Sequence, residues 1–108
     1  MGTNNNLIEY VKHKNDILAI IIRESFSKNG IEFFTPDDYT QQVGYMKRPK
    51  GYNIKPHIHY HIPRTVSTLQ EVLMIKKGKV RVDFYDFQKE YLISEILNKG
   101  DLIVLVSS

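Results

Sequence analysis

The sequence predicts an all-β protein in which short antiparallel strands form a sandwich or a barrel. Segments rich in β-branched and aromatic residues recur at intervals of roughly ten residues, and turn-forming Gly, Pro, Asn and Asp separate them. Few stretches have the periodicity of an amphipathic helix. The chain has 108 residues, 42% of them hydrophobic and 25% charged, which suits one small domain, 1–108, with a modest core.

The N-terminal part contains one strongly predicted strand. Residues 1–14 form an N-terminal extension, and its second half, 7–14, has no clear pattern. The run ILAIII at 17–22 is continuously apolar and contains four isoleucines. Because β-branched residues favour strands, this run predicts a buried strand. A helix that begins at Asn15 or Asp16 is the alternative.

Turn signals divide the middle of the chain into short segments. The sequence SKNG at 27–30 predicts a turn, and IEFF at 31–34 predicts a short aromatic strand. The sequence PDD at 36–38 marks the next turn. Residues 39–46, YTQQVGYM, predict another strand, and KRPKG at 47–51 predicts the turn after it.

Residues 71–87 predict a β-hairpin that turns around Lys77 and Gly78. The second arm of this hairpin alternates between apolar and polar residues, as a half-buried strand requires. One face carries Val80, Val82 and Phe84, and the other carries Arg81, Asp83 and Tyr85.

Two further strands are predicted near the C-terminal end, at 90–97 and 101–106. The turn sequence NKGD at 98–101 separates them. Together with the hairpin, they complete the pattern of closely spaced strands that predicts a sandwich or a barrel.

Composition and charge exclude several functional classes. The chain has no cysteine, so neither a disulfide framework nor a thiolate metal site can form. No secretory leader or bilayer-spanning apolar run occurs, which predicts a cytoplasmic protein without a membrane partner. The net charge is +3, but acidic residues lie among the basic clusters. This mixture predicts solvated turns and no nucleic-acid partner.

Three of the four histidines lie within five residues, at His57, His59 and His61. Side chains at every second position of a strand share a face, so we expect the three imidazoles to project together. The other face would carry the apolar side chains of Ile58, Tyr60 and Ile62. Imidazoles crowded on one face repel when protonated, whereas a divalent metal ion uses their lone pairs. A polar strand face in water is the alternative, and it is the interpretation that we give to His13.

The histidine region resembles the first conserved motif of the cupin superfamily. That motif consists of Gly, five residues, His-x-His, a short spacer, Glu, six residues and Gly. In this chain Gly51 precedes His57 by five intervening residues, and Glu71 precedes Gly78 by six. The spacer at 60–70 has eleven residues where the family pattern has three or four, a length that a loop between strands tolerates.

The resemblance covers residues 43–108 and is strongest to small single-domain bacterial cupin metalloproteins, some of them associated with surface-polysaccharide biosynthesis. It implies an antiparallel β-barrel of the jelly-roll, or double-stranded β-helix, type. It also implies a divalent metal ion held by His57, His59 and Glu71, with Fe, Mn, Ni or Zn all suited to such ligands. His61 is a candidate additional ligand or a neighbour of the ligands, and Arg64 is a weak candidate for binding an anion.

The second cupin motif would begin at Gly100 and is incomplete in this chain. It places Val106 where the family has Pro and Ser108 where it has Gly, and its histidine would fall three residues past Ser108. A barrel without its last strands exposes a sheet edge, which proteins commonly cover by pairing with another chain. Either the natural chain continues past Ser108, or the protein lacks the fourth ligand and the closing strands of the barrel. We expect a homodimer that covers the exposed edge.

The resemblance implies a metal-binding protein that acts on a small, oxygen-rich, carbohydrate-related molecule. Two alternatives of other classes remain open. The first is a metal-independent enzyme similar to cupin sugar-nucleotide isomerases and epimerases, in which a histidine serves as general base. The second is a non-catalytic module that binds a small ligand. The sequence selects neither a reaction nor catalytic residues.

Overall fold

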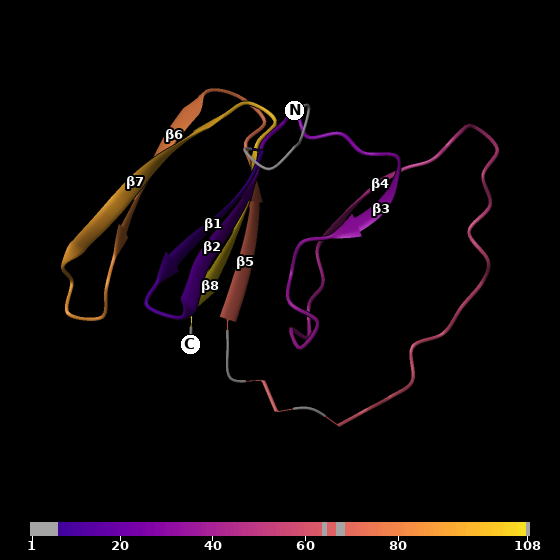
Figure 1. Ribbon diagram of the computed structural model, residues 1–108, viewed down its shortest axis with the longest axis horizontal. Coiled ribbons are helices and arrows are strands. Elements are labelled where there is room, and N and C mark those ends of the chain that lie inside the picture. The colour runs from indigo at the N-terminus through magenta and orange to yellow at the C-terminus, as the bar shows by residue number, and fades with distance from the viewer. Residues whose placement is uncertain (1–6, 64, 67–68, 108) are drawn as a thin grey trace. The chain divides into compact units, whose positions relative to one another are not determined.

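The computed structural model describes residues 7–63, 65–66 and 69–107 (Figure 1). This part of the chain contains eight strands and no helix, so the all-β prediction is confirmed. All strand pairings are antiparallel. The strands are β1 (Ile8–His13), β2 (Asp16–Ile22), β3 (Gly30–Phe33), β4 (Gly44–Lys47), β5 (Leu69–Met74), β6 (Lys79–Tyr85), β7 (Tyr91–Asn98) and β8 (Leu102–Ser107).

The chain divides into two compact units. The first combines the two ends of the chain, Met1–Phe26 and Thr68–Ser108, and the second is Ser27–Ser67. The first unit holds a four-stranded sheet with the order β1-β2-β8-β5 and the separate pair β6-β7. The second holds the pair β3-β4. Figure 1 shows indigo β1 and β2 beside yellow β8, so the two ends of the chain meet in one sheet.

Strand β2 lies inside the four-stranded sheet, between β1 and β8. Ala19 and Ile21 point to one face of the sheet, and Ile20 and Ile22 point to the other, because successive side chains of a strand alternate. All four side chains are buried. Burial on both faces explains why the run has no apolar–polar alternation, and it confirms the predicted buried strand over the helical alternative.

The β6–β7 hairpin packs on one face of this sheet. The core between them consists of Val11, Ala19, Ile21, Phe84, Leu97 and Ile103, with Val82 and Leu92 partly buried against it. The predicted alternation of β6 is therefore confirmed at Val82 and Phe84, whereas Val80, near the end of the strand, is 41% exposed. The opposite face of the hairpin carries Arg81, Asp83 and Tyr85.

The predicted hairpin at 71–87 is wrong, although both of its strands exist. Strand β5 pairs with β8 and strand β6 pairs with β7, so the chain passes from one sheet to the other at 76–78. The reason lies in Ile75, whose N–H donates to Asp101 O (2.9 Å) and whose carbonyl accepts from Gly100 N (2.6 Å). These bonds hold the end of β5 beside the start of β8.

Three other expectations differ from the structure. The strand predicted at 39–46 is shorter and begins at Gly44 as β4, because residues 39–43 form a hydrogen-bonded loop. The histidine stretch, predicted as a strand, has no strand partner among the described residues. The four-stranded sheet ends at β1 and β5, so the described strands form open antiparallel sheets and close into no barrel.

The side chain of Arg23, directly after β2, joins β1, β7 and the turn that precedes β8. Its Nε donates to Glu9 on β1 (2.9 Å), and its Nη1 donates to Asp101 (3.0 Å) and to the carbonyl of Ile96 on β7 (2.6 Å). Glu95 lies 3.4 Å from Nη2. One guanidinium therefore faces three carboxylates, all of them at most about one-third exposed.

The environment of Arg23 shifts the pKa values of Glu95 and Asp101 in opposite directions. Burial raises the pKa of Glu95, the negative charge of Glu9 raises it further, and the attraction of Arg23 opposes both effects without cancelling them. Burial would also raise the pKa of Asp101, but hydrogen bonds from the amides of Asn98 and Glu24 and from Arg23 outweigh it and lower that pKa. The stabilisation contributed by Asp101 is therefore present above its ordinary pKa of 3.8 and is lost as the pH falls through the lower folded value.

We predict that Glu95→Gln raises the free energy of unfolding at neutral pH. The folded state holds the Glu95 proton more tightly than the unfolded state, so the stability linked to this group is complete below its ordinary pKa of 4.5 and is lost as the pH rises through the folded value. The amide retains no charge at any pH. Urea unfolding measured from acid to neutral pH should show that Glu95→Gln increases the free energy of unfolding at neutral pH and not in acid. The control Glu90→Gln, at an exposed residue, should change this free energy little at any pH. A loss of stability at neutral pH in Glu95→Gln would contradict this assignment.

Candidate functional site

The side chain of Gln42 fixes the loop between β3 and β4. Its Nε2 donates to the carbonyls of Pro36 and Tyr39 (2.8 Å each), and its Oε1 accepts from Thr35 Oγ1 (2.8 Å). Thr35 Oγ1 in turn accepts from the amide of Val43 (3.1 Å). An amide side chain supplies both donors and an acceptor, so one residue satisfies three loop groups. The loop is therefore held in one shape.

A turn at 49–52 separates β4 from the histidine stretch. The amide of Tyr52 donates to Pro49 O (3.1 Å), and Gly51 has a φ of 87°, in the left-handed region that favours glycine. The guanidinium of Arg48 lies over the Tyr52 ring, 4.6 Å from its centroid. The predicted turn at 47–51 is confirmed, and the positive φ of Gly51 explains why a glycine occupies this position.

Residues 52–63, which we call the histidine segment, form no helix or strand. The side chains on the predicted apolar side are exposed, with 78% exposure at Ile58 and 82% at Tyr60. These side chains therefore lack the burial that one face of a packed strand would give them. Among the described residues, the segment has no hydrogen-bonded neighbour of the kind that a strand needs to become part of a sheet.

The histidine segment nevertheless brings His57 and His59 together. Their ring centroids are 5.2 Å apart, and the ring planes are inclined by 72°. Nδ1 of His57 lies 3.2 Å from the carbonyl oxygen of Lys55. Because a carbonyl only accepts, a hydrogen bond at this contact places the proton on Nδ1, and in the neutral ring the lone pair of Nε2 is then free. Metal-binding histidines commonly have this arrangement, in which the other ring nitrogen donates to a carbonyl.

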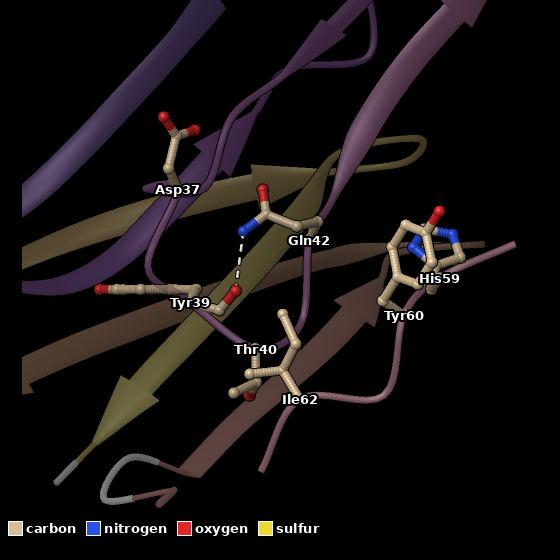
Figure 2. Close-up of a pocket in the computed structure, with 7 residues that line it drawn as sticks. All are labelled: Asp37, Tyr39, Thr40, Gln42, His59, Tyr60 and Ile62. Atoms are coloured by element: carbon tan, nitrogen blue, oxygen red, sulfur yellow. Dashed lines mark hydrogen bonds between the residues drawn. The ribbon is translucent and has the colours of Figure 1, made fainter. Parts of the chain in front are cut away.

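A cavity of about 650 Å³ lies within the second unit, between the loop and the histidine segment (Figure 2). Its lining is mostly polar or aromatic and consists of Asp37, Tyr39, Thr40, Gln42, His59, Tyr60 and Ile62. The loop residues among them were missed by sequence reasoning, which treated 36–38 as a turn and 39–46 as a strand. Only the dense polar composition of PDDYTQQ could have drawn attention to them.

Of the other predicted site residues, one lies in the first unit, one belongs to the histidine segment and one falls outside the described residues. Glu71 lies on β5 in the first unit, where its exposed side chain is on the same face as that of its cross-strand partner Leu105. His61 is exposed. Arg64 falls outside the described residues. Among the residues that the structure describes, no three His, Cys, Asp or Glu side chains group closely enough to hold a metal ion. The structure thus brings together the histidine pair of the second unit, whereas the predicted ligand Glu71 belongs to the first unit.

Comparison of the chain with protein-family models, curated proteins and solved structures found no match. In the part of the chain that the structure describes, no helix is long and apolar enough to cross a membrane.

We predict that Gln42→Leu loosens the loop that lines the cavity. Each lost hydrogen bond weakens the folded loop by about 1 kcal/mol, so exchange of the amide protons of Tyr39 and Val43 should accelerate roughly tenfold or more. Hydrogen exchange followed by NMR measures this change. Gln41→Leu is the matched control, because it makes the same substitution at the exposed neighbouring residue. Equal exchange rates in the two variants would show that Gln42 does not hold the loop.

Proposed function

We propose that this protein binds a divalent transition metal ion through His57 and His59, in the manner of a cupin, and holds a small oxygen-rich ligand beside the ion. The observation that carries the proposal is the 5.2 Å separation of the two imidazole centroids. Two imidazoles that bind one tetrahedral ion, with nitrogen–metal distances of about 2.0–2.1 Å, have centroids about 5 Å apart. The separation of 5.2 Å is compatible with a shared ion.

The chemistry of the pair also favours a metal. Both histidines are exposed, so neither imidazole must leave a buried position to bind. The Lys55 carbonyl favours the His57 tautomer that has a free Nε2 lone pair. Glu71 is the proposed carboxylate ligand, on the strength of the cupin spacing, and His61 is the competing candidate. Fe, Mn, Ni and Zn all suit two imidazoles and a carboxylate.

The cavity supports a ligand next to this pair, because His59 belongs to both. Its volume of about 650 Å³ is typical of small-molecule sites. The carboxylate of Asp37 and the hydroxyl of Thr40 can accept hydrogen bonds from ligand hydroxyl groups. When bound, a divalent ion supplies Lewis-acid polarisation of a ligand oxygen. His59 would then place that oxygen at the wall of the cavity.

We predict that the purified protein, reconstituted with zinc, binds about one equivalent and that the double variant His57→Ala, His59→Ala binds none. Elemental analysis after gel filtration measures the content, and calorimetric titration measures the affinity. His13→Gln is the control, because it removes a histidine on β1 without touching the pair. Its zinc content should equal that of the unchanged protein.

Two single variants identify the third ligand. If Glu71 binds the ion, Glu71→Gln should weaken zinc binding by roughly 100-fold while His61→Gln changes it little. The reverse result would assign the third position to His61. Absence of metal from the unchanged protein after reconstitution with Fe(II), Mn(II), Ni(II) and Zn(II) would reject the proposal. Turnover in metal-free protein would favour general-base chemistry instead.

A further inference from the structure

The outer face of the β6–β7 hairpin carries an ordered group of polar and aromatic side chains, which we call the hairpin face: Arg81, Asp83, Tyr85, Tyr91 and Ser94. This face is opposite the one that packs on the core through Val82 and Phe84. Asp83 pairs with Ser94 across the strands, and Tyr85 pairs with Tyr91. Residues from both strands therefore meet on one surface.

A continuous chain of hydrogen bonds links the polar groups of the hairpin face. Ser94 Oγ donates to Asp83 Oδ1 (2.5 Å), so the Tyr91 hydroxyl, 2.8 Å from Ser94 Oγ, donates to it. Nε of Arg81 lies 3.1 Å from Asp83 Oδ1, although the Arg81 side chain is 67% exposed. These contacts fix the Asp83 carboxylate and leave guanidinium N–H groups directed to solvent.

The two tyrosine rings provide exposed apolar surface next to these polar groups. Their centroids are 5.9 Å apart with an interplanar angle of 74°, an edge-to-face contact that fixes both ring planes. Tyr85 remains 52% exposed and Tyr91 58% exposed. The hydrogen bond of Tyr91 to Ser94 adds a second restraint on one of the rings.

The turn that joins the two strands is held as firmly as the face itself. The amide of Asp86 donates to Glu90 O (2.9 Å), and Asp86 Oδ1 accepts from the amides of Gln88 and Glu90 (2.9 Å each). Lys89 has a φ of 67°, which closes the turn. A ligand on this surface would therefore meet side chains that are already ordered, which lowers the entropy lost on binding.

The charge of the hairpin indicates which ligands suit it. Residues 79–98 contain three basic residues (Lys79, Arg81 and Lys89) and four acidic residues (Asp83, Asp86, Glu90 and Glu95), a net charge of −1. A polyanion such as nucleic acid needs a clearly positive surface. A neutral ligand with an apolar face and many hydroxyl groups suits this surface. Its apolar face can pack on the aromatic rings, and its hydroxyl groups can form hydrogen bonds with the carboxylate and the guanidinium.

We propose that the hairpin face binds a neutral saccharide, with a sugar ring stacked on Tyr85 and its hydroxyl groups bonded to Asp83 and Arg81. The C–H face of a pyranose packs on a phenol ring as an apolar surface does. Its hydroxyl groups donate to the carboxylate and accept from the guanidinium. This site lies in the first unit and does not depend on the metal.

The test is an NMR titration of the full chain with the neutral glucose oligosaccharides cellohexaose and maltohexaose and with chitohexaose. We expect saturable shifts of the Tyr85 and Tyr91 ring signals with at least one of them. Tyr85→Ala should weaken binding roughly tenfold, and Asp83→Asn should weaken it as well. Tyr52→Ala is the matched control, because it removes an exposed tyrosine that also carries an arginine over its ring. It should leave the affinity unchanged.

Amide NMR spectra of each variant test whether the hairpin remains folded. If Tyr85→Ala unfolds it, Tyr85→Leu keeps an apolar side chain without the flat ring and should show the same loss. Absence of a saturable shift with all three oligosaccharides would overturn the proposal. So would undiminished binding in Tyr85→Leu and Asp83→Asn. Saturable shifts with single-stranded oligothymidylate and none with the sugars would assign the face to nucleic acid and would also overturn it.

Discussion

The first unit depends on one constraint, which is that β2 needs a neighbour along each edge and cover on each face. Its isoleucines are buried on both faces, so its backbone N–H and C=O groups are shielded from water and need strand partners along both edges. One neighbour, β1, precedes it directly in the chain, and the other, β8, lies at the opposite end of the sequence. The sheet is complete only when the last strand reaches the second, and β5 then pairs with the free edge of β8. Such non-local pairing slows folding, because a long loop must close before the contacts form.

The strands were predictable where local sequence determines them, and their partners were not. The continuous apolar run of β2 and the alternation in β6 indicate strands, because burial on one or two faces leaves a direct trace in the order of residues. The pairing of β5 with β8 leaves no such trace. It depends on the backbone hydrogen bonds of Ile75 with Gly100 and Asp101, which are distant from Ile75 in the sequence. A glycine at position 78 predicts a change of direction but does not distinguish a hairpin turn from a passage between sheets.

The candidate metal site was predictable to a similar extent. The i, i+2 spacing of His57 and His59 was enough to predict that their imidazoles lie near each other, since any extended backbone brings alternate side chains to one side. It was not enough to predict a strand, because a strand needs a pairing partner and the local sequence does not determine whether one is present. The wall of the cavity was hidden for a different reason. Gln42 acts through three loop contacts, and an isolated glutamine in a polar stretch gives no sign of them.

The division of the chain into two units has a consequence for how the protein can change over time. The second unit occupies Ser27–Ser67, between two stretches that together make the first, so it is an insertion in the topological sense. No strand pairing among the described residues joins one unit to the other. Lengthening an inserted segment adds only a logarithmic entropy cost to the closure of the surrounding chain. Residues 27–67 can therefore gain, lose or exchange histidines and loop residues without altering the register of β2 and β8, so new ligand chemistry can evolve on a scaffold whose strand order is already set.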